Sequence, residues 1–246
     1  MKRKYLFISS ITIMLISIVV ICFVHLRSIA QPQGSTNSRS VIELFTSEGC
    51  SSCPAADKLV AEIQQNHTDV LVLCYHVDYW NHLGWKDTYS SAKNTARQRY
   101  YTGIFKLDGA YTPQAVINGE QECVGSDKGT LLHAINNKAL SATSDLRINA
   151  IIKGKSIEVN CTAEKTDNNI VVCLVQKQAS THVKNGENEG RILNHINLVR
   201  DFKIATGKQI SFELPEGVDK SNIFVAALLQ DKKTGNISGY NTSEIK

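Results

Sequence analysis

The sequence predicts an α/β domain followed by an all-β sandwich domain, because its two halves carry different hydrophobic patterns. Within residues 41–75, a strand-like apolar run, a segment with helical spacing and a second apolar run follow one another. Strand, helix and strand in this order predict a right-handed βαβ unit with parallel strands. From residue 145 onward, apolar and polar residues alternate in short runs without helical spacing. That alternation is typical of an antiparallel sandwich.

The predicted βαβ unit contains a CxxC motif between its first strand and its helix. Residues 41–46 precede Cys50 and Cys53, and apolar residues at 56, 59, 60 and 63 then share one helical face. The cysteines therefore lie at a helix N-terminus, where free N–H groups and the helix dipole favour a thiolate. We expect Cys50 to be the more exposed, attacking sulfur and Cys53 the resolving sulfur of a thiol–disulfide exchange centre.

Further elements of the first half follow from local signals. They are a strand at 70–75, a helix at 91–104, strands at 114–117 and 120–124, and a helix capped by Ser126. Asn118-Gly119 predicts a hairpin turn between the last two strands. His76 and Asp78 share one face at the carboxyl end of the 70–75 strand, where open α/β sheets carry ligand sites. They are candidate proton-transfer groups for Cys53, or alternatively a hydrogen-bonded pair that holds the aromatic segment after them.

In the second half, the alternating runs predict a series of short strands. They lie at 146–152, 157–163, 171–175, 198–204, 209–214, 223–229 and 237–240. Cys161 and Cys173 are equidistant from Asp167, the centre of a predicted hairpin, so we expect a structural disulfide between them. The change of pattern places the predicted domains at residues 41–142 and 143–246.

The N-terminus predicts export. Lys2-Arg3-Lys4 precedes an apolar run at 5–24, and Ser28-Ile29-Ala30 has the small residues of a cleavage site, which predicts a signal peptide over residues 1–30. The run is also long enough to span a bilayer, so an uncleaved membrane anchor is the alternative. Either places the chain beyond a polar linker at 31–40 outside the cytoplasm, in the periplasm or cell envelope or secreted.

Charge and cysteine content agree with export. Four of the 27 basic residues and no acidic residue lie before residue 31, so the rest of the chain carries 23 basic and 23 acidic residues. This neutrality gives no reason to expect a nucleic-acid partner. Apart from Cys22, the six cysteines form an even number, which suits an oxidising compartment.

Several longer motifs resemble the DUF1223 family, a group of exported bacterial proteins with a thioredoxin-like domain. The motifs occupy residues 43–54, 76–80, 83–87, 95–99 and 111–114, with weaker matches over 186–200. The resemblance implies that Thr112-Pro113 forms a cis peptide bond that faces the CxxC motif across a substrate groove. It also implies that Arg191 and His195 lie in a loop at 181–197 that covers this groove. Unlike thioredoxins, the motif encloses Ser-Ser, which leaves the direction of electron flow open.

The sequence therefore predicts an extracytoplasmic thiol–disulfide oxidoreductase that acts on a protein or small-molecule thiol or disulfide. No organic cofactor and no metal is implied. A non-enzymatic envelope binding module with a structural Cys50–Cys53 disulfide is one alternative. A metal-handling protein is another, in which His76 and His82 would add to the two cysteines.

Overall fold

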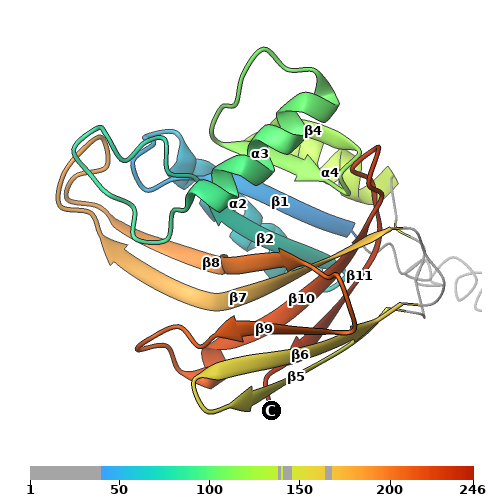
Figure 1. Ribbon diagram of the computed structural model, residues 1–246. Helices are drawn as coiled ribbons and strands as arrows, with labels where there is room; N and C mark the ends of the chain where they lie inside the picture. Colours follow the sequence, from blue (N-terminus) through green and yellow to red (C-terminus); the bar gives the residue numbers. More distant parts are fainter. Residues whose placement is uncertain (1–39, 138–139, 141–145, 164–167) are drawn as a thin grey trace, which may run out of the picture. The chain divides into compact units, whose positions relative to one another are not determined.

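The computed structural model describes residues 40–137, 140, 146–163 and 168–246, which contain two β-sheets and three α-helices (Figure 1). In chain order the elements are β1 (Ser40–Thr46), α2 (Cys53–Asn66), β2 (Val70–His76), α3 (Ala92–Phe105), β3 (Gln114–Ile117), β4 (Gln121–Val124), α4 (Lys128–Asn137), β5 (Arg147–Lys153), β6 (Ser156–Thr162), β7 (Asn169–His182), β8 (Ile192–Ile204), β9 (Gln209–Glu213), the 3-10 helix η1 (Lys220–Asn222), β10 (Ile223–Gln230) and β11 (Ile237–Glu244). The larger sheet has eight strands in the order β11-β10-β7-β8-β2-β1-β3-β4, and the smaller has three in the order β5-β6-β9.

The predicted βαβ unit and hairpin of the first half are both present. β1 runs parallel to β2 along its whole length and antiparallel to β3, which continues into β4. Asn118 and Gly119 both have positive φ angles, 53° and 66°, and the N–H of Glu120 donates to the carbonyl of Ile117 over 3.0 Å. A Cβ atom on Gly119 would lie 2.0 Å from the Gly235 carbonyl oxygen, so only glycine fits this turn.

The two halves of the chain join in one sheet. β8 lies beside β2 in parallel, with Cys74 opposite Leu198, and β7, β10 and β11 extend the sheet antiparallel beyond it. The predicted sandwich therefore takes a different form, because one of its layers is the far part of the eight-stranded sheet. The predicted boundary near residue 143 lies among residues 141–145, outside the described residues.

Three hydrophobic clusters hold these layers together. The first lies between one face of the large sheet and helices α2 and α4, and includes Leu44, Val72, Val60 and Leu131. The second covers the opposite face, where Phe45 stacks on Tyr75 with ring centroids 5.4 Å apart and meets Tyr101 of α3. The third fills the space between the two sheets and includes Val159 and Phe212 of the small sheet and Val172 and Val225 of the large one.

The predicted disulfide between Cys161 and Cys173 does not form, and both are free thiols. β6 pairs with β5 and β9, whereas β7 pairs with β8 and β10, so the expected hairpin between them is absent. Cys161 lies in the core between the sheets, and Cys173 faces the other core, with its sulfur 3.3 Å from the Tyr75 hydroxyl. Alternation identified the buried face of each strand but not the strand beside it.

The helix ends show one further difference from the sequence-based prediction. Ser91 caps α3 by accepting a hydrogen bond from the N–H of Asn94. The α4 helix is capped by Asp127, not Ser126, since the Asp127 carboxylate accepts hydrogen bonds from the Thr130 N–H and hydroxyl over 3.0 and 2.7 Å. Within residues 40–137, 140, 146–163 and 168–246, no helix has the length and apolar character needed to cross a bilayer.

Candidate functional site

The CxxC motif occupies the turn between β1 and α2, as predicted. The N–H of Cys50 donates to the Ser47 carbonyl, and the N–H of Cys53, the first residue of α2, donates to the Cys50 carbonyl, each over 3.2 Å. The Cys50 sulfur lies 3.3 Å from the Ser52 hydroxyl and 3.8 Å from the Thr112 carbonyl oxygen. The Thr112–Pro113 bond is cis, in agreement with the prediction. Thr112, which with Pro113 immediately precedes β3, therefore lies beside the Cys50 sulfur.

The two sulfurs have opposite pKa shifts. Hydrogen bonding to Cys53, and then to Ser52 and Thr112, lowers the pKa of Cys50 to about 6, although burial acts in the other direction. Burial and the neighbouring Cys50 raise the pKa of Cys53 far above its ordinary value. At neutral pH this arrangement holds a thiolate at Cys50 and a thiol at Cys53.

The sequence predicted Cys50 to be the more exposed cysteine, but both cysteines are buried. Cys50 is 1% exposed and Cys53 is fully buried, although Ser51 and Ser52 between them are exposed. Part of the cover is Trp80, whose indole N–H donates to the Thr112 hydroxyl over 2.8 Å. A Cβ atom on Gly49 would lie only 3.1 Å from the Trp80 Cβ, so the motif and the Trp80 segment pack closely.

The loop between β7 and β8 is hydrogen-bonded to the backbone of the motif, and Figure 1 shows it at the same end of the molecule as the turn before α2. The side-chain amide of Asn188 donates to the carbonyls of Glu48 and Cys50 over 2.8 and 2.9 Å. The N–H of Ser51 donates to the Glu187 carboxylate over 2.9 Å. β7 and β8 are longer than predicted, so the loop spans residues 183–191 instead of 181–197.

Arg191 and His195, which the family resemblance placed over the groove, act less directly. Arg191 remains in the loop, and its guanidinium donates to the Asn188 side-chain oxygen over 3.0 Å. His195 belongs to β8, is buried, and its Nε2 lies 3.1 Å from the Glu48 carboxylate. Both residues support the backbone around the motif and neither contacts a cysteine sulfur through a hydrogen bond.

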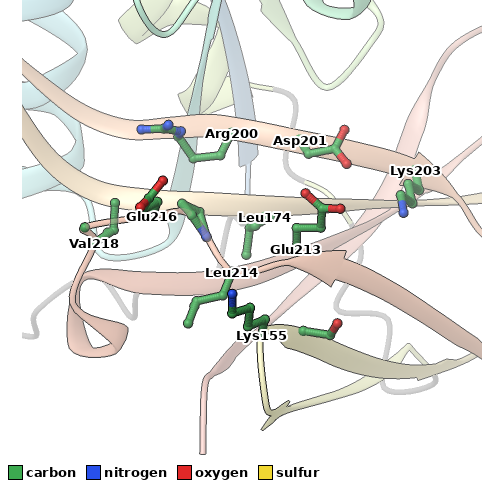
Figure 2. A pocket seen from close by; sticks show the side chains of 12 residues that line it. Lys155, Leu174, Arg200, Asp201, Lys203, Glu213, Leu214, Glu216 and Val218 are labelled. Atoms are coloured by element: carbon green, nitrogen blue, oxygen red, sulfur yellow. The ribbon is translucent and has the colours of Figure 1, made fainter.

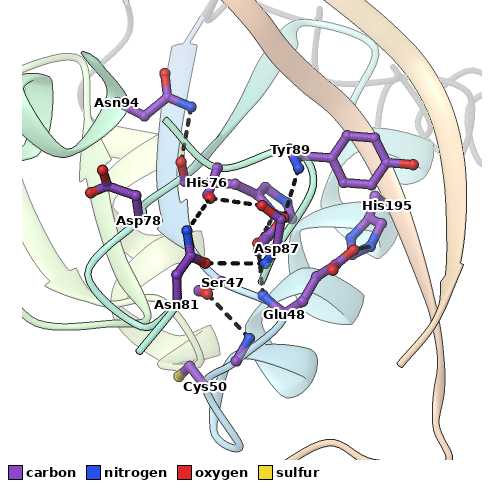
Figure 3. Close-up of polar contacts among 12 residues, drawn as sticks. Ser47, Glu48, Cys50, His76, Asp78, Asn81, Asp87, Tyr89, Asn94 and His195 are labelled. Atoms are coloured by element: carbon purple, nitrogen blue, oxygen red, sulfur yellow. Dashed lines mark hydrogen bonds and ion pairs between the residues drawn. The ribbon is translucent and has the colours of Figure 1, made fainter. Parts of the chain in front are cut away.

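A buried cluster of ionisable side chains lies beneath the motif (Figure 3). Nδ1 of His76 lies 2.6 Å from the Asp87 carboxylate, which also accepts the N–H of Glu48 over 2.9 Å. The rings of His76 and His195 are 4.9 Å apart. Burial alone would lower the pKa of His76, but the Asp87 carboxylate raises it overall, and His76 in turn holds the pKa of Asp87 low despite burial. The two side chains therefore form a buried ion pair.

The predicted partnership of His76 with Asp78 does not form. Asp78 accepts a hydrogen bond from the hydroxyl of Thr95 in α3 over 2.6 Å, whereas His76 pairs with Asp87. Of the two alternatives for His76, a hydrogen-bonded pair that holds the aromatic segment is therefore present, with a different acid. β2 ends at His76, so Asp78 lies beyond the strand. There, the alternation along a strand no longer determines which way a side chain points.

Sequence reasoning missed Asp57, the acid one helical turn after Cys53. Part of the residue is exposed, but its carboxyl group is buried, and burial raises its pKa although His76 and His195 act against this. Its negative charge also contributes to the raised pKa of Cys53. The signal was a charged residue at position i+4 from a buried cysteine, on the face of α2 that packs inward.

The other thiols and the possible metal ligands are less suited to chemistry. Burial raises the pKa of Cys74, and of Cys123 to about 11, so both are protonated at neutral pH. Among the residues that the structure describes, no group of three or more His, Cys, Asp or Glu side chains is arranged to hold a metal ion.

A cleft of about 1050 Å³ opens elsewhere, between β8 and the segment after β9 (Figure 2). It is lined by charges of both signs, including Lys155, Arg200, Asp201 and Glu213. None of the cysteines, and neither Thr112 nor Pro113, contributes to its lining. The cleft is therefore separate from the CxxC motif.

Comparison with known proteins assigns the family. The model of a protein family of unknown function, DUF1223, matches residues 41–230, which include the CxxC motif, Pro113 and the 183–191 loop. This chain belongs to the DUF1223 family. The DUF1223 chain is similar to protein AGR_C_4864 from Agrobacterium tumefaciens, at 30% identity and a TM-score of 0.62 over 82% of this chain and 92% of that one.

A second solved structure is much less similar to the DUF1223 chain. It is a domain of the outer membrane lipoprotein Omp28 from Porphyromonas gingivalis, at 15% identity and a TM-score of 0.27 over 43% of this chain and 89% of that one. A similarity this low carries no inference. No curated protein matches the sequence.

Proposed function

We propose that this DUF1223 protein is an extracytoplasmic thiol–disulfide oxidoreductase with Cys50 as nucleophile and Cys53 as resolving cysteine. The observation that carries the proposal is the asymmetry of the pair. Cys50 has a pKa lowered to about 6 and lies 3.8 Å from the Thr112 carbonyl, whereas the pKa of Cys53 is strongly raised. A low-pKa attacking thiol beside a protonated second thiol is the arrangement that disulfide exchange requires.

In its reducing direction, the proposed exchange begins when the Cys50 thiolate attacks one sulfur of a partner disulfide. The partner's S–S bond breaks, its other sulfur leaves as a thiolate, and a mixed disulfide with Cys50 forms. Cys53 then loses its proton and attacks the Cys50 sulfur, which releases the second partner thiolate and leaves a Cys50–Cys53 disulfide. Two electrons pass to the partner in this direction, and the same steps in reverse oxidise a partner dithiol and reduce the Cys50–Cys53 disulfide.

Asp57 is the proposed acceptor of the Cys53 proton. Its buried carboxyl group has a raised pKa and interacts electrostatically with Cys53. A base with a pKa raised toward neutrality is better matched to a thiol than an ordinary exposed carboxylate. His76 and Asp87 both influence this proton, since His76 lowers the pKa of Asp57 and Asp87 raises it.

The lowered pKa of Cys50 also favours one direction of electron flow. A stabilised thiolate makes the reduced form of the pair more stable, so the disulfide form is a stronger oxidant. We propose that the protein accepts electrons from partner thiols, with a potential above the roughly −270 mV typical of thioredoxin. Equilibration of the pair with glutathione buffers measures this value.

The order of β1, the CxxC turn, α2, β2 and a Pro113-led β3 supports a thioredoxin-like arrangement within the mixed sheet. The predicted signal or anchor in residues 1–30, with its apolar run at 5–24, supports a periplasmic or cell-envelope location but lies outside the described residues. Fusion of a reporter that is active only outside the cytoplasm after residue 40 tests this location.

The partner is proposed to be a protein or small-molecule thiol or disulfide, and trapping tests it. In a Cys53→Ser variant, the Cys50 thiolate can attack but the mixed disulfide is not resolved, so partners should accumulate as covalent adducts that reductant releases. The Cys50→Ser variant is the matched control and should trap nothing. Equal adducts in both variants, or none in either, would contradict the proposal.

A second candidate function is a binding module in which Cys50 and Cys53 form a permanent structural disulfide. The burial of both sulfurs favours this alternative. The two functions differ in how easily the pair is reduced. A disulfide that stays oxidised in strong dithiol under native conditions would support the structural role, and rapid reduction would support exchange.

A further inference from the structure

We propose that the loop at residues 183–191, here called the latch loop, is a releasable cover that keeps Cys50 closed until a partner docks. Asn188 is the residue that positions it. This inference rests on the proposed function, because a cover over Cys50 matters only where a partner sulfur must reach it.

Both amide hydrogens and the side-chain oxygen of Asn188 have partners in the motif or in its own loop. The residue is 0% exposed, and its amide group donates to the carbonyls of Glu48 and Cys50, on either side of Gly49. Its side-chain oxygen accepts from Arg191. A buried amide with three hydrogen bonds is well held, and two of these bonds fix the backbone that carries the Cys50 sulfur.

Glu187 makes the third connection, from the exposed surface of the latch loop. Its carboxylate accepts the N–H of Ser51, next to the start of α2, over 2.9 Å. This hydrogen bond lowers the pKa of Glu187, so the side chain is charged at neutral pH. Because the contact is open to water, it is easily exchanged for solvent.

The latch loop is internally bonded, so it can separate from the motif as a unit. Val183 donates its N–H to the Arg191 carbonyl, Gly190 donates to the Val183 carbonyl and Glu189 donates to the Gly186 carbonyl, over 2.9–3.1 Å. Gly186, with a φ of 79°, packs against Trp85, where a Cβ atom would lie 3.3 Å from the tryptophan Cβ. Opening therefore needs the loss of three side-chain hydrogen bonds and one close contact, while the turn itself stays intact.

Access to the reacting sulfur requires this release. Cys50 is 1% exposed, and disulfide exchange requires direct contact between its sulfur and a partner sulfur. Trp80 and the Thr112 segment cover one side, and they are tied to each other through the Trp80 indole. The latch loop is bonded to the backbone on both sides of Gly49, from a part of the chain more than a hundred residues away. It is joined to its own strands only at its two ends, so it is the element best able to move.

The test is the rate of Cys50 alkylation in the reduced full-length protein at neutral pH, with modification followed by mass spectrometry of the Cys50 peptide. Iodoacetamide serves as the small reagent and a polymer-linked maleimide as the large one. We expect Asn188→Ala to raise the iodoacetamide rate about tenfold, which corresponds to ~1.4 kcal/mol lost from the closed state. Glu187→Gln should raise it roughly twofold to threefold, because an amide still accepts the hydrogen bond but without the charge.

The control is Glu189→Gln, on the same loop, whose side chain makes no hydrogen bond or ion pair within the described residues. Its rates should equal those of the wild type. In Asn188→Ala the maleimide rate should rise by a larger factor than the iodoacetamide rate, since a cover discriminates by size and a simple pKa change does not. Unchanged rates in folded Asn188→Ala, or equal factors for the two reagents, would overturn the proposal.

If Asn188→Ala does not fold, as judged by thermal unfolding, Glu187→Gln decides alone, and a rate equal to that of Glu189→Gln overturns the proposal. Alkylation needs no disulfide exchange, so it is independent of the trapping experiment. Accelerated alkylation without trapped partners would support the releasable cover and contradict the oxidoreductase function. Trapped partners with unchanged alkylation would support the oxidoreductase function and contradict the cover.

Discussion

At the scale of single residues, the chemistry depends on how two neighbouring thiols are made different. Both sulfurs are buried, so burial alone would raise both pKa values. Hydrogen bonding reverses this effect at Cys50, because Cys53, Ser52 and Thr112 together lower the pKa of its thiol to about 6. Cys53 has no comparable set and keeps its proton. The difference arises from the hydrogen-bonding partners and the burial of each sulfur.

The first prediction concerns the ionisation of Cys50. Its alkylation rate should rise with pH around a midpoint near 6, because only the thiolate reacts and its pKa is lowered to about 6. Ser52→Ala removes the hydroxyl 3.3 Å from the sulfur and should raise the midpoint by roughly one pH unit, the equivalent of one hydrogen bond to a charged group. Ser126→Ala, at an exposed serine, is the control. A midpoint near the ordinary thiol value in the wild type would contradict the assignment.

The second prediction concerns Asp57. An Asp57→Asn variant should resolve mixed disulfides roughly 100-fold more slowly, because Cys53 loses its proton acceptor. Stopped-flow release of the second equivalent of thiol from a small aromatic disulfide measures this step. Attack by Cys50, read from the first equivalent, should keep its wild-type rate. Slowing of both steps by the same factor would indicate a structural effect instead of proton transfer.

At the scale of elements, helix α3 is tied to the centre of the large sheet by a buried ion pair. Arg97 donates to the Glu43 carboxylate over 2.6 Å, and the Tyr101 hydroxyl donates to the same carboxylate. Glu43 is fully buried on β1, and its side chain lies on the same face of the strand as Val41 and Phe45. A buried carboxylate is destabilising unless it is paired, so Arg97 of α3 supplies the positive charge that Glu43 of β1 requires.

The third prediction tests this attachment. Arg97→Met should lower the free energy of unfolding by about 3–5 kcal/mol, because it leaves a buried carboxylate without its cation. Arg99→Met, at an exposed position of the same helix, should change it by less than about 0.5 kcal/mol. Urea unfolding followed by circular dichroism gives both values. In the double variant Arg97→Met with Glu43→Gln, part of the loss should be recovered, and equal losses in the single and double variants would contradict the charge argument.

At the scale of the whole molecule, the decisive feature is that β8 lies beside β2. This contact makes one sheet from strands on both sides of residue 143, and it brings the β7–β8 loop to the CxxC motif. The core on the α3 face also crosses this line, since it contains Tyr75 and Tyr101 together with Val175 and Val199. Without the second half, the first half would therefore expose an apolar face and an unpaired strand edge.

The fourth prediction follows from that shared core. A fragment of residues 40–142 should not unfold cooperatively and should bind a hydrophobic dye, whereas residues 40–246 should show one cooperative transition. Calorimetry and dye fluorescence distinguish the two results. A cooperative transition of the fragment alone would support an independently folding first domain, as the pattern of the sequence predicts.

Much of the fold and the core of the candidate site could be predicted because their signals are local. The CxxC motif at the start of α2 and the Asn118-Gly119 turn could both be predicted from a few neighbouring residues, and the family could be predicted from its motifs. Which side chains and which strands pair with one another could not be predicted. His76 pairs with Asp87 instead of Asp78, and Cys173 lies in a different sheet from Cys161.

By itself, the sequence determined the order of helices and strands in the first half, which faces are apolar, and that two cysteines lie at a helix N-terminus. These properties depend on residues a few positions apart, and the backbone period converts spacing directly into geometry. The tertiary structure alone decided that Cys50 is covered, that Asn188 holds it, and that β2 has β8 as its neighbour. Strand pairing brings together residues far apart in the chain, and the alternation within each strand specifies a face but no partner.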